Sequence, residues 1–262
     1  MDYPTCSENS KNARFSRLED PAKDFPFYNG APTTISISQW LLVLVMLIAG
    51  FLALALPIHW PSEVLAQFAP AVLMPLLPLL ALAYVAPGHW RAIFGRVGWR
   101  EAKLMIGFAL LNIIVSMSVG AIVFALTAVA PNATAAQLEA LDTAGRIAFF
   151  AKTIPQLFGE EVITILPFLA LMQLLWKGLG VGRRGAIVVA WLLSSAAFGL
   201  IHLPTYDWNL IQCLVIIGSA RMVLTLPWIM TKNIWVSTGA HIVNDWLLLG
   251  VGLLGAGLVG KV

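Results

Sequence analysis

Six ionisable residues interrupt the apolar runs of this 262-residue chain and are the candidates for chemistry: Glu160, Glu161, His202, Arg221, His241 and Asp245. Inside a bilayer each costs about 2.5–3.5 kcal/mol on insertion scales, so such residues mark a functional site by default. Two imidazoles with three carboxylates can bind a divalent metal such as zinc, for which the candidate ligands are His202, His241 and Glu160. The same groups can instead activate a water directly. Both chemistries predict hydrolysis of a carbonyl compound, although a proton-linked transporter uses the same residue types.

The spacing of these residues along the sequence suggests a role for each of them. Side chains of the adjacent Glu160 and Glu161 diverge by about 100° on a helix, so only one of them can face a given target. Two close carboxylates in a low dielectric do not both ionise easily, which suits a general acid or base, although a wetted pair at the membrane interface is also compatible. His241 and Asp245 stand four residues apart and share a helical face, where the carboxylate can orient an imidazole. His202, taken alone, is more typical of a structural or interfacial histidine.

The composition defines the elements that must position these residues. Hydrophobic residues make up 59% of the chain and charged residues 11%, against about 45–50% and about 25% in soluble domains. This excludes a soluble enzyme, a disordered chain, a collagen and a disulfide scaffold, and predicts an all-α, polytopic membrane bundle of about seven to eight transmembrane helices. Apolar runs long enough to cross a bilayer cover residues 39–57, 64–86, 104–130, 155–176, 186–203, 208–230 and 233–250. The stretch 247–262 either extends the last helix or forms a separate one.

Two segments lie outside these runs. Residues 1–35 are polar and rich in proline, and are expected to form a flexible cytosolic tail, followed by a transmembrane domain over residues 36–262. Residues 133–154 are expected to form an amphipathic helix on the membrane surface before Pro155 opens the next span.

The distribution of basic residues predicts the orientation. Lys and Arg gather in cytoplasmic loops. With the N-terminus in the cytosol, twelve of the sixteen basic residues fall in inside segments, three fall outside and Arg221 lies within a span. The net charge of +3 therefore reflects membrane topology and does not indicate nucleic-acid binding. Cys6 and Cys213 show neither a metal-site spacing nor a disulfide pattern.

Three motifs resemble those of the CAAX-protease and bacteriocin-processing family of intramembrane proteases, also called the Abi family. Its first motif is a Glu-Glu pair followed after three residues by Arg, matched here by Glu160-Glu161. Its second is Phe-x-x-x-His, which reads Phe198-Gly-Leu-Ile-His202, and its third is His-x-x-x-Asn or Asp, which reads His241-Ile-Val-Asn-Asp245. The resemblance covers residues 150–250.

The first motif departs from the family pattern, because Ile165 stands where the family places Arg. In the family that Arg lies one turn from the second glutamate and neutralises it through an i,i+4 pair. We hypothesise that Arg221 replaces it from another span. The alternative is that Arg221 reaches the membrane interface or binds backbone carbonyls.

The resemblance implies an endopeptidase that cleaves a peptide or membrane-protein substrate at or in the lipid bilayer, in a bacterial cytoplasmic (inner) membrane. It assigns Glu160 as the water-activating base and Glu161 as its partner. His202 and His241 become water- or metal-positioning groups, and Asp245 an orienting or oxyanion-side group. Two alternatives remain: a catalytically silent relative acting as a binding or immunity-type protein, which the missing Arg favours, and a proton-linked transporter.

Overall fold

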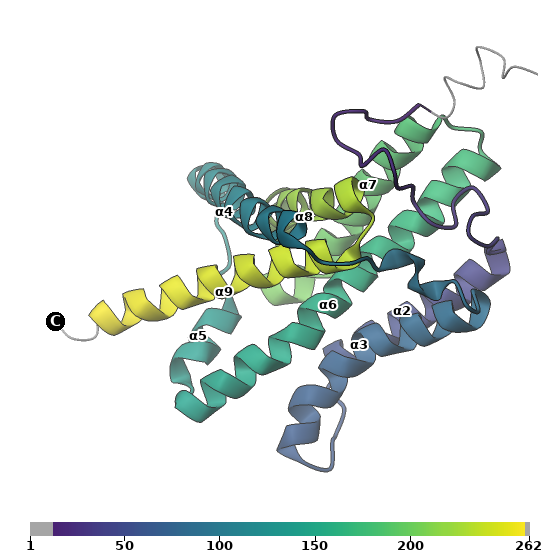
Figure 1. Ribbon diagram of the computed structural model, residues 1–262. Helices are drawn as coiled ribbons and strands as arrows, with labels where there is room; N and C mark the ends of the chain where they lie inside the picture. Colours follow the sequence, from purple (N-terminus) through teal and green to yellow (C-terminus); the bar gives the residue numbers. More distant parts are fainter. Residues whose placement is uncertain (1–12, 260–262) are drawn as a thin grey trace, which may run out of the picture.

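The computed structural model describes residues 13–259, except for the side chains of residues 133, 135 and 254–259. Helices account for the regular structure of this range, with no strand in it, and short loops join them (Figure 1). Within the described range, six helical segments are long and apolar enough to cross a membrane: α2 (Ile37–Ala55), α3 (Glu63–Val85), α4 (Trp99–Leu126), α6 (Thr143–Gln173) continued by η2 (Leu174–Gly178), α7 (Arg183–Leu200), and η4 (Gln212–Ile217) continued by α8 (Gly218–Thr231). The predicted polytopic helical membrane bundle is confirmed.

The seventh predicted run forms α9 (Ile234–Val259), which is continuous with the residues after 250 as far as position 259. It is not among the six candidate spans found in the described residues, and its first half carries His241, Asn244 and Asp245. Residues 260–262 lie outside the described range.

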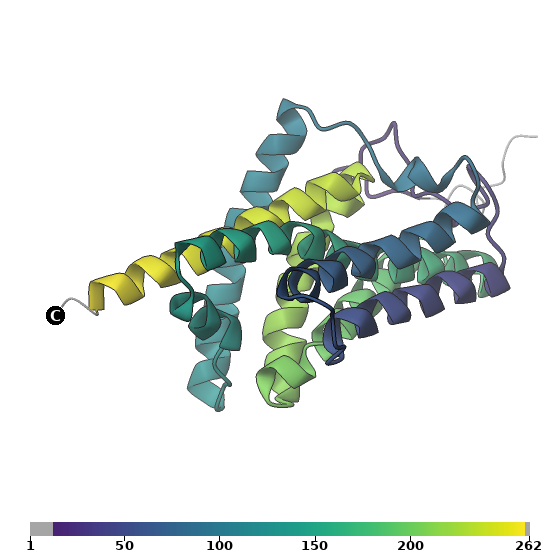
Figure 2. The ribbon, with the colours of Figure 1, turned by 90° about the horizontal axis from the view of Figure 1, so that it is seen from below.

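The helices pack in two groups that share α6. One group places α3 between α2 and α6, and the other places α4 against α8 and α9 (Figures 1 and 2). Helix α6 also contacts α7 and α9. Because α6 is covered on several sides, residues such as Val162, Ile165, Phe168 and Leu169 are fully buried in the core.

The segment before the fourth span differs from the prediction of a single surface helix over residues 133–154. A short helix, α5 (Ala133–Ala140), ends before Asp142, whose side chain caps α6 by accepting a hydrogen bond from the Gly145 amide at 2.8 Å. Helix α6 then runs through Pro155 without interruption. With Asp142 as its N-cap, α6 begins at Thr143, which is twelve residues before Pro155, where the sequence predicted the start of the span.

The prediction of a flexible N-terminal tail is wrong for residues 13–35. Phe25, Phe27 and Ile35 are buried in the core. Glu19 is also buried and accepts a bidentate pair of hydrogen bonds from Arg183 at 2.7 and 2.5 Å and a third from Lys232 at 2.9 Å. These partners lie more than 160 positions away in sequence, which is why the pairing could not be anticipated. Residues 1–12 of the predicted tail lie outside the described range.

Burial and ion pairing shift the pKa values of Glu19 and Lys232. Burial opposes ionisation of Glu19, but the hydrogen bonds from Arg183 and Lys232 outweigh it and lower the pKa of Glu19 to about 2. Burial lowers the pKa of Lys232 to about 8, and Glu19 offsets part of that effect. The pair fixes the N-terminal segment to the starts of α7 and α9.

The molecule has two ends of different charge. Residues 13–35, η1 (Trp90–Ile93), the start of α4 and the turns before α7 and α9 form the basic end. The start of α3, α5, the start of α6, and η3 (Leu203–Tyr206) with the turn after it form the opposite end (Figure 2). In the described range, the basic end carries Glu19, Asp20, Asp24 and Glu101 against Arg14, Arg17, Lys23, Arg91, Arg96, Arg100, Lys103, Lys177, Arg183, Arg184 and Lys232. The opposite end carries Arg146 and Lys152 against Glu63, Glu139, Asp142 and Asp207.

Candidate active site

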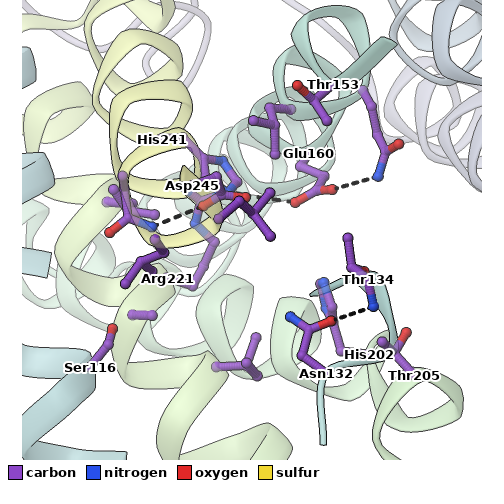
Figure 3. Close-up of a pocket in the computed structure, with 18 of the residues that line it drawn as sticks. Ser116, Asn132, Thr134, Thr153, Glu160, His202, Thr205, Arg221, His241 and Asp245 are labelled. Atoms are coloured by element: carbon purple, nitrogen blue, oxygen red, sulfur yellow. Dashed lines mark hydrogen bonds and ion pairs between the residues drawn. The ribbon is translucent and has the colours of Figure 1, made fainter. Parts of the chain in front are cut away.

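A polar cavity of about 430 Å³ lies between α4, α5, α6, α8 and α9. Its walls include five of the six residues selected from the sequence: Glu160, His202, Arg221, His241 and Asp245 (Figure 3). The sixth, Glu161, is fully buried behind the wall. Residues from α6, the end of α7, α8 and α9 thus meet at one place, as the sequence predicts.

Glu161 is the centre of a buried network. Its Oε1 accepts a hydrogen bond from Arg221 Nη2 at 2.5 Å and contacts His241 Nδ1 at 2.9 Å. The carboxylate and the guanidinium have no exposed side-chain surface, and the guanidinium carbon lies 4.7 Å from the centre of the Phe198 ring. The hypothesis that Arg221 replaces the missing motif arginine across space is confirmed as a contact.

This network sets the orientation of His241. A carboxylate oxygen can only accept, so Nδ1 of His241 must carry the proton that points at Glu161. The other ring nitrogen, Nε2, then faces the cavity. It lies 3.7 Å from Glu160 Oε2 and 3.7 Å from Asp245 Oδ1. Glu161 thus orients His241 in the way that an outer carboxylate orients a functional imidazole.

The two adjacent glutamates have different surroundings. The Glu160 side chain keeps 13% of its surface exposed, against 0% for Glu161. Its only hydrogen bond from a described residue comes from Gln156 Nε2 and is long, at 3.4 Å. Glu160 is therefore the carboxylate that a substrate or a water can reach.

His202 occupies a different part of the cavity wall. Figure 3 shows it apart from the cluster of Glu160, His241 and Asp245. Its Nδ1 lies 2.8 Å from the Phe198 carbonyl oxygen, which can only accept, so Nδ1 is the protonated nitrogen and Nε2 is left for the cavity. His202 therefore lines the same cavity but does not belong to the cluster of Glu160, His241 and Asp245.

The predicted metal ligands do not assemble. Among the residues that the structure describes, no group of three or more His, Cys, Asp or Glu side chains is placed to hold a metal ion. His202 stands apart from Glu160 and His241, and His241 directs Nδ1 at Glu161. The set of His202, His241 and Glu160 therefore does not fit a metal in this geometry, and no chemical step is assigned to one.

Three polar residues of the site were missed from the sequence. Asn112 of α4 donates to the Asn244 side-chain oxygen at 3.0 Å, and Asn244 donates to Asp245 Oδ1 at 2.9 Å. Burial, reinforced by the charges of Asp245 and then Cys213, raises the pKa of Tyr206 to about 12, so this phenol stays protonated on the cavity wall. Asn112 could have been noticed as an amide within the apolar run of α4. An amide inside a span is weaker evidence for a functional site than a charged side chain.

The arrangement defines a class of protein: a multi-pass membrane protein with glutamate and histidine side chains gathered at a cavity between its helices. Residues 143–247 match the family model Rce1-like, described as type II CAAX prenyl endopeptidase Rce1-like. This match spans all three motifs and confirms the family resemblance. The family is one of proteases, which supports a hydrolase. Neither a curated protein nor a solved structure matches the chain.

Proposed function

We propose that this protein is an intramembrane endopeptidase that hydrolyses a peptide bond with a water activated by Glu160. The observation that carries the proposal is the division between the two adjacent glutamates. Glu160 is open to the cavity, whereas Glu161 is buried and bound to Arg221 and His241. One carboxylate is free to exchange a proton with a water, and the other holds the site together.

The reaction follows from this division. Glu160 takes a proton from water, and the hydroxide oxygen adds to the carbonyl carbon of the scissile bond. The tetrahedral intermediate carries its negative charge on the former carbonyl oxygen, which hydrogen-bond donors on the cavity wall stabilise. Tyr206 is such a donor, because its phenol stays protonated. The C–N bond then breaks as Glu160 returns the proton to the leaving amine.

The buried network supports this reaction from behind. Glu161 and Arg221 hold His241 with Nε2 beside Glu160 and Asp245. An imidazole fixed in this way can accept a hydrogen bond from a water next to Glu160. Asp245 is held in turn by Asn244.

The missing motif arginine was the feature that favoured a catalytically silent relative. Arg221 supplies the same ion pair from α8, which supports the enzyme over the silent protein. The expected setting is the cytoplasmic membrane of a bacterium with the N-terminus in the cytosol, because the basic end includes the N-terminal segment. The substrate is a peptide or a membrane protein.

The test is the hydrolysis of a membrane peptide by purified protein carrying Glu160→Gln. We expect the rate to fall by about 10²–10⁴, the usual contribution of a general base, with unchanged thermal stability because Glu160 makes one long hydrogen bond within the described residues. The control is Glu139→Gln, an exposed glutamate of α5, which keeps the wild-type rate. Wild-type hydrolysis by the Glu160→Gln protein rules out the proposal. Binding without cleavage by the wild-type protein supports the silent relative instead, and flux into liposomes supports a transporter.

A further inference from the structure

The cavity opens at one end of the molecule. The exposed residues of its lining include Asn132 and Gln137, on α5 and its approach, and Thr205 of η3, whereas Arg221 and His241 are buried. All of these elements belong to the end opposite the N-terminal segment. The exposed part of the cavity wall therefore lies at this end, at α5 and η3.

The other end is covered. Residues 13–35 pack over the helix ends there, and Glu19 joins this segment to Arg183 at the start of α7 and to Lys232 just before α9. From Lys232 to His241 is nine residues, or about 14 Å of helix. The reacting groups are thus separated from the basic end by buried core residues that include Ile165, Phe168 and Trp228.

The charges of the two ends differ in sign. In the described range, eleven basic and four acidic side chains lie at the covered end, and two basic and four acidic side chains lie at the open end. Short loops rich in Lys and Arg stay in the cytoplasm. The covered end is therefore the cytosolic one.

We propose that the cavity takes its peptide from the non-cytosolic side of the membrane. The substrate class is then an extended peptide segment exposed outside the cytosol, either a free exported peptide or the juxtamembrane part of a membrane protein. The inference about cleavage rests on the proposed protease function, but the side on which the cavity opens does not.

The first experiment measures this side without any activity. Single cysteines are introduced by Gln137→Cys at the open end and Lys177→Cys at the covered end, in a chain carrying Cys6→Ser and Cys213→Ala. Gln137 and Lys177 are both exposed, which makes the two variants matched. We expect a membrane-impermeant maleimide to label the Gln137→Cys protein in intact spheroplasts and the Lys177→Cys protein only after permeabilisation. The reverse pattern overturns the proposal.

The second experiment separates this inference from the protease function. In detergent, peptide can reach both ends of the protein. Absence of cleavage in detergent therefore contradicts the protease function and does not bear on the side from which peptide enters. In liposomes sorted by orientation with the same cysteines, we expect peptide added on the Gln137 side to be cleaved and peptide added on the Lys177 side to stay intact. Cleavage only from the Lys177 side refutes the proposed direction of entry. A soluble peptide and a lipid-tethered one are compared: cleavage of both indicates exported peptides, and cleavage of the tethered one alone indicates membrane proteins.

Discussion

Arg221→Leu is the substitution that tests the buried network most directly. The change removes the guanidinium that lies 2.5 Å from Glu161 Oε1, in a place where neither side chain is exposed. Glu161 must then keep its charge with His241 as the partner that remains, or take up a proton, and in both cases the position of the carboxylate that orients His241 is no longer fixed by an ion pair. Removing one member of a buried ion pair costs about 3–5 kcal/mol. At about 2–4 °C per kcal/mol, the expected fall in Tm is roughly 6–20 °C.

The assay combines thermal unfolding in detergent with hydrolysis measured on the folded fraction. The matched control is Arg183→Leu, which removes another fully buried arginine from its carboxylate partner, Glu19, at the opposite end of the molecule. Both variants lose stability. Only Arg221→Leu is expected to lower kcat, because Arg221 holds Glu161 and His241 in place and Arg183 does not contact the cavity wall.

A second substitution restores the ion pair from within α6. Ile165 lies one turn after Glu161 and is fully buried, and the Arg221 guanidinium reaches the neighbouring Thr164 at 3.5 Å. An arginine at position 165 can therefore place its charge where that of Arg221 was. We expect Ile165→Arg to recover part of the activity of Arg221→Leu and to destabilise the wild-type protein. An Arg221→Leu protein with wild-type Tm and kcat would refute the reasoning on both counts.

Two further predictions concern stability and helix packing. Because the pKa of Glu19 falls from 4.5 to about 2 on folding, its stabilisation is complete above about pH 4.5 and is lost as the pH falls toward 2. Thermal unfolding between pH 2 and 5 should therefore show an acid slope that Glu19→Gln reduces. A Cβ at Gly199 would meet the Cys213 carbonyl oxygen, so Gly199→Ala should separate α7 from η4, shift His202 and lower both Tm and hydrolysis. Gly120→Ala on α4 is its control, because open space surrounds that position, and a small gain in Tm is expected from helix propensity alone.

The fold class and the membership of the site were accessible from the sequence for the same reason. Apolar composition at this level requires a bilayer, and any charge that persists in a bilayer needs a compensating function. Glu160, His241 and Asp245 were selected by this cost alone, and they meet within 3.7 Å. The cost argument does not depend on helix packing, and it succeeds without knowledge of which helices are neighbours.

The parts that the sequence did not predict depend on packing. Residues 13–35 carry the prolines and mixed charges of a flexible segment, yet Glu19 is buried and paired with Arg183 and Lys232. The predicted metal ligands do not come together for a related reason. Residue types allow His202, His241 and Glu160 to bind a metal, but the direction of each imidazole is decided by a neighbour, Glu161 for His241 and the Phe198 carbonyl for His202.

Arg221 shows why a missing motif residue is weak evidence against activity. A buried carboxylate such as that of Glu161 needs a positive charge beside it, and the position of that charge in space matters more than its position in the sequence. An arginine one turn along α6 satisfies this need, and so does an arginine that reaches the same carboxylate from α8, sixty residues later in the chain. The buried pair and His241 form one contact network. Sequences that lack the first-motif arginine should therefore be searched for a lone basic residue in another span before the protein is assigned as inactive.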